Sequence, residues 1–297
     1  MSVQIKFCGA AGTVTGSCYW IQTNGYQFLV DCGLFQGTKT IKELNYSAFP
    51  FDPREIDFVL LTHAHIDHCG LIPKLVKAGF KGPIYTTAAT HDLLTYMLPD
   101  SGYIQETEVK HLNRRNRQRG RDPVQPIYNL IDAEAALQQI RTVIYEKWQR
   151  PHNDIQVRYW NAGHILGSAS IEVEIMDNDK KLRLLFSGDI GPDNKLFHPD
   201  PDAPGSFDYV FCESTYGGRN RDDLSIDLRR QTLMEEINDA MHAGGTLVIP
   251  SFAVERTQEL LLDISYLIKH EMIPCSTVFL DSPLAIRITS VFCRSCS

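Results

Sequence analysis

The 297-residue chain lacks long apolar runs. Its apolar stretches, such as "FVLL" at 58–61, are far shorter than the roughly 20 residues that a membrane-spanning helix needs. The first twelve residues, "MSVQIKFCGAAG", also hold no apolar segment of the length that a secretory signal contains. These two absences predict a cytoplasmic protein that has no membrane partner.

A regular cysteine pattern is missing as well. The eight cysteines fall at irregular spacings, and reduced thiols are typical of a protein that is not secreted. The segment "CRSC" at 293–296 has the spacing of a zinc or redox pair, but a lone pair in a polar segment is weak evidence for either.

Positive charge is scarce over the chain as a whole. Lys and Arg number 29 against 36 Asp and Glu, which gives a formal charge of −7. This average disfavours a polyanionic partner, yet it hides one strongly basic segment, because Lys110 and five arginines fall within residues 110–121. That segment is either a surface that steers a polyanion or a solvated helix face.

What the chain does contain falls into two parts. Short strand-like runs separated by turns dominate residues 1–207, where a helix capped by Asp132 is expected to run through 129–148. From residue 208 onward, long helical patterns alternate with strand-like segments at 245–253 and 276–283. This change predicts a domain of residues 1–207 and a second, of βαβ type, over 208–297.

The segment "LLTHAHIDHCG" concentrates three histidines and an aspartate directly after an apolar strand. These residues are His63, His65, Asp67 and His68. Strand ends are where α/β proteins usually place their chemistry, and imidazole and carboxylate groups are the N and O ligands that zinc binds. A cluster of polar residues at the start of a helix is the alternative, but three histidines within six positions favour a metal site.

Three further residues repeat this strand-end context. Asp31 follows "QFLV", His164 lies in the glycine-flanked loop "NAGHILGS", and Asp189 follows "LRLLF" within "SGDIG". Each alone is equally well explained as a loop or turn residue. Together with the histidine cluster they predict one metal centre that holds two ions.

In their order and spacing, Asp31, the run HAHIDH at 63–68, His164 and Asp189 resemble the successive motifs of the metallo-β-lactamase superfamily. The resemblance implies the α/β fold of that family, an αββα sandwich that carries two Zn²⁺ ions. It also implies the site roles: His63, His65 and His164 hold one zinc, Asp67 and His68 hold the other, Asp189 bridges them, and Asp31 orients a liganding histidine.

The C-terminal part resembles the β-CASP insert found in nucleases of this superfamily. The matching segments are "CESTYGGR" (212–219), "IPSFAVERTQELL" (249–261) and "LDSPLAIRIT" (280–289). The basic segment also resembles this branch, particularly its bacterial and archaeal members related to the cleavage-and-polyadenylation endonuclease. The resemblance implies a zinc-dependent ribonuclease, endo- or 5′-exonucleolytic, that hydrolyses phosphodiester bonds of single-stranded RNA, and it allows a homodimer.

The same resemblance assigns roles in the C-terminal part. Glu213 matches a catalytic acid that, in the family, orients a histidine. Ser251 and Arg256 lie on a strand-to-helix turn suited to contact phosphate. An ion pair with Glu259 is the alternative for Arg256.

The sequence departs from this branch in its histidine motifs. After Asp189 the sequence shows no HxH-like or SGH-like motif, and it ends within what resembles the insert. We therefore expect a C-terminally incomplete chain with a weakened second zinc site and no general acid. The competing hypotheses are an inactive, metal-binding paralogue and a small-molecule (thio)esterase. The missing histidines favour the paralogue, and the β-CASP-like segments disfavour the esterase.

Overall fold

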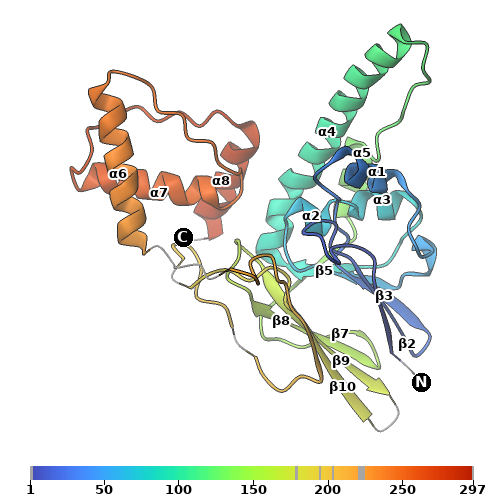
Figure 1. The fold of residues 1–297 in the computed structure, drawn as a ribbon. Helices are drawn as coiled ribbons and strands as arrows, with labels where there is room; N and C mark the ends of the chain where they lie inside the picture. Colours follow the sequence, from blue (N-terminus) through green and yellow to red (C-terminus); the bar gives the residue numbers. More distant parts are fainter. Residues whose placement is uncertain (1–2, 178–179, 194, 203, 220–224, 296–297) are drawn as a thin grey trace.

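The computed structural model describes residues 3–177, 180–193, 195–202, 204–219 and 225–295. Two β-sheets form its centre, with helices α1–α5 against the first sheet and helices α6–α8 at one side (Figure 1). The predicted α/β class with a two-sheet sandwich is confirmed. None of the described helices combines the length and the apolar character needed to cross a bilayer.

The first sheet has six strands in sequence order. Strands β1 to β3 pair antiparallel, whereas β3 to β6 are parallel. The carboxyl ends of β3 and β4 therefore lie side by side at one edge, and the residues that follow them meet there. The strands are β1 (Gln4–Phe7), β2 (Tyr19–Thr23), β3 (Tyr26–Val30), β4 (Phe58–Leu60), β5 (Ile84–Thr87) and β6 (Ile140–Val143).

The second sheet has five strands in the order β11-β10-β9-β8-β7. Apolar side chains alternate along β8, where Ile155, Val157 and Tyr159 are buried against the first sheet. The outer face of the second sheet bears charged side chains instead, including Arg158 of β8 and Glu172 of β9. The strands are β7 (Gln149–His152), β8 (Ile155–Asn161), β9 (Ala169–Asp177), β10 (Lys180–Phe186) and β11 (Tyr209–Phe211).

Five helices and two short 3-10 turns accompany the first sheet, and an apolar core that includes Leu29, Val59 and Leu75 fills the space beneath them. Helix α4 packs on β5 and β6 of the first sheet, and α5 packs on α3 and α4. These elements are α1 (Lys39–Glu43), η1 (Leu44–Tyr46), η2 (Pro53–Glu55), α2 (Ile66–Cys69), α3 (Ile72–Lys77), α4 (Ala88–Gln118) and α5 (Leu130–Leu137).

The helix predicted over 129–148 is shorter than expected, and Asp132 is not its N-cap. Asn129 is the N-cap: its side chain accepts the Asp132 N–H at 2.9 Å, while the Asp132 carboxylate accepts the Asn129 N–H at 3.0 Å. The helix ends at Leu137 because the next residues pair with β5 as strand β6. The β-branched residues of "IRTV" favour that strand.

The C-terminal part contains three helices, α6 (Ile226–His242), α7 (Arg256–Lys269) and α8 (Pro283–Ser295). The strands expected at 245–253 and 276–283 do not form, so the predicted βαβ alternation is wrong for the described residues. A strand needs a neighbour for its backbone groups, and these segments have none here. Their side chains are left open to solvent, with Val248, Phe252 and Phe279 80%, 84% and 86% exposed.

The connection between the two parts runs through strand β11. This strand pairs with β10 in parallel, so the second sheet continues to Phe211. The domain boundary at residue 207 stays a prediction. Helix α8 packs against α4, which joins the C-terminal helices to the sandwich.

Candidate metal centre

The candidate metal centre lies where β3, β4 and β10 end. Asp31 directly follows β3 and has a φ of 60°, an unusual value that its contacts to the next strand stabilise. Its Oδ1 accepts hydrogen bonds from the Thr62 N–H at 2.9 Å and the Thr62 hydroxyl at 3.0 Å. Gly188, with a φ of 56°, brings the loop after β10 so close that a Cβ there would lie 2.9 Å from Thr62 Cβ. Asp189 is thereby placed beside the histidines.

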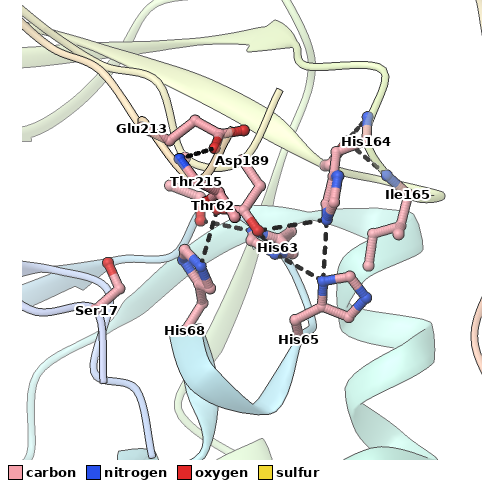
Figure 2. Close-up of polar contacts among 12 residues, drawn as sticks. Ser17, Thr62, His63, His65, His68, His164, Ile165, Asp189, Glu213 and Thr215 are labelled. Atoms are coloured by element: carbon pink, nitrogen blue, oxygen red, sulfur yellow. Dashed lines mark hydrogen bonds and ion pairs between the residues drawn. The ribbon is translucent and has the colours of Figure 1, made fainter. Parts of the chain in front are cut away.

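Four predicted ligands converge on one point. His63, His65, His164 and Asp189 each offer a ligand atom, and these atoms all lie within 4.8 Å of one another (Figure 2). His65 Nδ1 is 3.1 Å from the Nε2 atoms of both His63 and His164. Ligands around a tetrahedral zinc with bonds of about 2.0–2.1 Å are separated by roughly 3.3 Å. Three nitrogens and one carboxylate oxygen at this spacing fit a divalent metal ion.

Asp189 faces both halves of the predicted site. Its Oδ2 lies 3.4 Å from His164 Nε2 and 3.7 Å from His63 Nε2, whereas its Oδ1 lies 3.2 Å from His68 Nε2. This arrangement is the one that a bridging carboxylate requires. Asp67 is half-buried, and neither it nor His68 belongs to the convergent group of four. The assignment of Asp67 and His68 to a second ion therefore stays a prediction.

Asp31 holds His68 from the opposite side. Its Oδ2 lies 2.7 Å from His68 Nδ1, which leaves Nε2 directed at Asp189. Both side chains are buried. A carboxylate in this position fixes the histidine tautomer with Nδ1 protonated and raises the basicity of Nε2, as the orienting role predicted for Asp31 requires.

The electrostatics of the cluster favour metal binding by neutral imidazoles. Burial, together with the neighbouring imidazoles, lowers the pKa of His63 and His65, and it lowers the pKa of His164 to about 3. Burial alone would also lower the pKa of His68, but the carboxylates of Asp31 and Asp189 raise it well above its usual value. Burial opposes ionisation of Asp189, yet the hydrogen bond from His68 and the nearby histidines lower its pKa to about 2.

Glu213 lies beside the Asp189 loop, just after β11. Its Oε1 accepts the Ile190 N–H at 3.0 Å. Its Oε2 accepts the Thr215 N–H at 3.2 Å (Figure 2). Among the described residues, no histidine forms a hydrogen bond or ion pair with this carboxylate. The contacts that it does make hold the backbone next to Asp189, while its predicted catalytic role stays a prediction.

Ser251 and Arg256 form no hydrogen bond or ion pair with the four-residue group in the part of the chain that the structure describes. The Ser251 hydroxyl lies 2.7 Å from that of Thr257. Arg256 pairs with Glu259 at 3.2 Å while its side chain stays 56% exposed, which is the alternative given above. Their predicted contact with phosphate stays a prediction.

Sequence reasoning missed three residues that support the site. Thr62 connects Asp31 to His63, since its hydroxyl also lies 3.0 Å from His63 Nδ1. The Lys195 ammonium donates to the carbonyl oxygen of His164. Glu255 pairs with Lys195 at 3.4 Å and accepts the Leu166 N–H at 3.3 Å, so it joins α7 to the His164 loop. Only Thr62 carried a signal in the sequence, because it directly precedes the histidine run.

Residues 11–225 match the family model of the metallo-beta-lactamase superfamily. The chain belongs to this superfamily. Its predicted β-CASP branch is supported by relatives that match nearly the whole chain. Ribonuclease TTHA0252 of Thermus thermophilus is 36% identical over 286 residues, 96% of this chain and 60% of the relative. Transcription termination factor FttA of Methanosarcina mazei is 30% identical over 281 residues, 94% of this chain and 42% of the relative.

An RNase J-like protein of Methanocaldococcus jannaschii is similar at 32% identity over 298 residues, 98% of this chain and 61% of that relative. The chain thus spans about 42–61% of the length of these three relatives. The superfamily and the His/Asp cluster together indicate metal binding at the site described above.

Proposed function

We propose that the chain carries the metal centre of a zinc-dependent ribonuclease that hydrolyses phosphodiester bonds of single-stranded RNA. The convergence of His63, His65, His164 and Asp189 carries the proposal, because it provides a zinc-type donor set in a metallo-β-lactamase superfamily chain. The substrate class is taken from the relatives, two of which are named as a ribonuclease and an RNase J-like protein.

Two zinc ions are proposed. His63, His65, His164 and Asp189 would hold one, and Asp67 and His68 would hold the other with Asp189 between them. Zinc bound here would supply a Lewis acid for the phosphate and would lower the pKa of a bound water toward neutrality. The lowered pKa values of His63, His65 and His164 keep these three imidazoles neutral, which is the state that binds metal.

The remaining residues keep these donors in place. Asp31 holds His68 with Nε2 directed at Asp189, and Glu213 fixes the backbone at Ile190. We propose that Arg256 and Ser251 approach the RNA backbone only when RNA is present, since Arg256 is engaged with Glu259 here. The cytoplasmic location remains a prediction. A homodimer is proposed on the exposure of Val248, Phe252 and Phe279.

The test combines metal content with RNA cleavage. Metal per chain is measured after dialysis by elemental analysis, beside hydrolysis of a labelled single-stranded RNA with and without chelator. The variant His65→Ala removes one ligand, and His242→Ala, on the exposed face of α6, is the matched control. We expect up to two zincs, the second more weakly held, and chelator-sensitive cleavage for the parent and the control, and loss of one zinc and of cleavage for His65→Ala.

An inactive, metal-binding chain is the second candidate, favoured because no histidine among the described residues forms a hydrogen bond or ion pair with Glu213. Metal bound at full content without RNA cleavage would support that candidate. Absence of metal from the parent chain would contradict both.

A further inference from the structure

Helix α4 carries a concentration of positive charge at the end remote from the metal centre. We call residues 110–121 the basic tip; its cations are all exposed. Figure 1 shows that this end of α4 extends beyond the other helices of the sandwich. The cations are Lys110, Arg114, Arg115, Arg117, Arg119 and Arg121.

The six cations of the basic tip outnumber the acids beside them in the sequence. Within the described ranges, none of its six cations forms an ion pair, although exposed acids stand nearby at Glu106, Glu108 and Asp122. Lys110 and Arg114 are four residues apart on α4. Like charges at this spacing repel and destabilise a helix by about 0.2–0.5 kcal/mol per pair. An ordinary solvated helix face alternates charges of opposite sign instead.

The turn that ends the basic tip is held in place. Asn113 bonds the backbone of Val124 twice, at 2.8 and 2.9 Å, and the Asn116 side chain donates to the Asp122 carbonyl oxygen. The Arg121 N–H donates to the Asn116 carbonyl oxygen at 2.9 Å. The cations therefore extend from a fixed scaffold rather than from a free loop.

A groove of about 830 Å³ adjoins the basic tip, between α1 and the return segment after α4. Leu112 and Val124 of the α4 side and Lys42 and Tyr46 of the α1 side line it. Tyr46 is 57% exposed, and Lys42 is exposed and forms no ion pair in the described part of the chain. Exposed aromatic rings beside cations are the elements that bind single-stranded nucleic acid, by base stacking and by phosphate contact.

The basic tip is far from the metal centre along α4. The first turn of α4 is fixed to the His164 loop, because the Thr87 and Thr90 hydroxyls both donate to the Gly167 carbonyl oxygen. From Ala88 to Arg114 the helix rises about 39 Å at roughly 1.5 Å per residue. A stacked single strand advances about 3.4 Å per nucleotide, so about 12 nucleotides are needed to reach both places.

We propose that the basic tip and the adjoining groove form an exosite for the phosphate backbone of single-stranded RNA, which gives the protein a preference for RNAs long enough to reach it. The inference rests on the proposed ribonuclease function for the identity of the polyanion. It adds a second point of RNA contact, remote from the metal ligands.

The test measures binding of a 20-nucleotide and a 5-nucleotide single-stranded RNA by fluorescence anisotropy over a series of salt concentrations. The variant Arg114→Gln/Arg115→Gln/Arg117→Gln removes three charges of the tip, and Tyr46→Ala alters the groove. The matched control, Lys81→Gln/Lys147→Gln/Arg150→Gln, removes three exposed cations elsewhere. Thermal unfolding verifies that each variant is folded.

We expect the tip variant to bind the 20-nucleotide RNA about tenfold more weakly and to lose about 2 units of the slope of log K against log salt, since each single-strand phosphate contact contributes about 0.7. Tyr46→Ala should weaken binding of the same RNA by a smaller factor. The 5-nucleotide RNA and the control variant should show no change.

Equal weakening by the tip and control variants, or equal weakening for both RNA lengths, would overturn the exosite. Binding of the tip to vesicles of anionic phospholipid in preference to the 20-nucleotide RNA would overturn the choice of RNA. Because binding is measured without turnover, a tip effect in a chain that does not cleave RNA would support the exosite and contradict the proposed function alone.

Discussion

At the scale of single residues, Asp31 connects two parts of the predicted metal site. Its Oδ1 accepts hydrogen bonds from the backbone N–H and the hydroxyl of Thr62, and its Oδ2 bonds Nδ1 of His68. One side chain thus connects the residue before the histidine run to the last histidine in it. The contact explains why an aspartate occupies a position with a φ of 60°.

Replacement of Asp31 by Asn should weaken metal binding without unfolding the protein. The neutral amide no longer raises the basicity of His68, and loss of such a partner typically costs about 10–100-fold in metal affinity. Zinc titration with a competing chelator measures the change. Asp92→Asn is the control, since Asp92 faces His91 at 3.7 Å on the exposed part of α4. Equal affinity of the Asp31 and Asp92 variants would contradict this role.

The stability of the metal-free protein should fall as the pH decreases below about 6.5, the usual histidine value. His63, His65 and His164 have lowered pKa values in the folded state, about 3 for His164. Between the folded-state pKa of each histidine and its ordinary value of about 6.5, the unfolded chain therefore binds more protons than the folded protein. Each such group contributes up to about 1.4 kcal/mol of stability loss per pH unit. His68, whose pKa is raised, acts oppositely: its stabilising contribution is complete below about 6.5 and is lost as the pH rises through its folded-state value.

Denaturant unfolding of the metal-free chain from pH 4 to pH 7 measures this dependence. The variant His164→Gln has no titrating group at this position. It should therefore reduce the slope of the free energy of unfolding against pH by the contribution of one histidine. An unchanged slope in that variant would show that His164 is protonated in the folded protein.

At the scale of elements, the second sheet keeps a buried carboxylate on its outer face. Glu172 of β9 is fully buried beneath Arg158 and Arg183, which bond it at 2.9 and 2.6 Å, and Trp160 donates to it at 2.9 Å. Burial raises the pKa of Glu172, but these hydrogen bonds lower it below its usual value. The network joins β8, β9 and β10 across the sheet.

Replacement of Glu172 by Gln should lower the free energy of unfolding by about 2–3 kcal/mol, because two guanidinium groups lose their partner. This is below the range for fully buried pairs, since the arginine side chains are 22% and 25% exposed. Chemical denaturation measures the change. Glu134→Gln, an exposed position on α5, should change the stability by less than about 0.5 kcal/mol. Equal effects of the two substitutions would contradict the account.

Element prediction from the sequence succeeded where the local pattern and the tertiary contacts agree. The alternating apolar residues of β8 were visible in the sequence. The presence of helix α5 was also predicted, although Asn129 and not Asp132 is its N-cap. The end of α5 at Leu137 was not, because the strand-forming residues that follow it are decided by the neighbour β5. The segments 245–253 and 276–283 have strand composition but no partner strand among the described residues, so they do not form strands.

At the scale of the whole molecule, Glu255 joins the C-terminal helices to the His164 side of the candidate metal centre. This residue precedes α7 with a φ of 70°, and its carboxylate bonds His198 at 2.8 Å, Lys195 at 3.4 Å and the Leu166 N–H at 3.3 Å. It is buried. Glu255 thereby connects the C-terminal helices to the loop that carries His164.

Replacement of Glu255 by Gln should loosen this connection, because a buried charge-assisted contact is replaced by a neutral one at a cost of about 1–3 kcal/mol. We expect faster proteolysis of the C-terminal helices and weaker binding of the metal held by His164, measured by limited proteolysis and by zinc titration. Glu271→Gln is the control: Glu271 also has a positive φ, 57°, but is exposed. Unchanged zinc affinity in the Glu255 variant would show that the connection does not extend to the metal site.

The sequence by itself determined the chemistry of the site and the sheet pattern of its first part. Three histidines within six positions, the strand-end acids and the alternation of apolar residues are local features, so they can be read in order along the chain. The tertiary structure alone decided which predicted ligands converge, that Glu255 contacts the His164 loop, and that the basic tip extends away from the metal centre. These depend on how strand ends and helices separated by tens of residues pack together, and no local pattern encodes that.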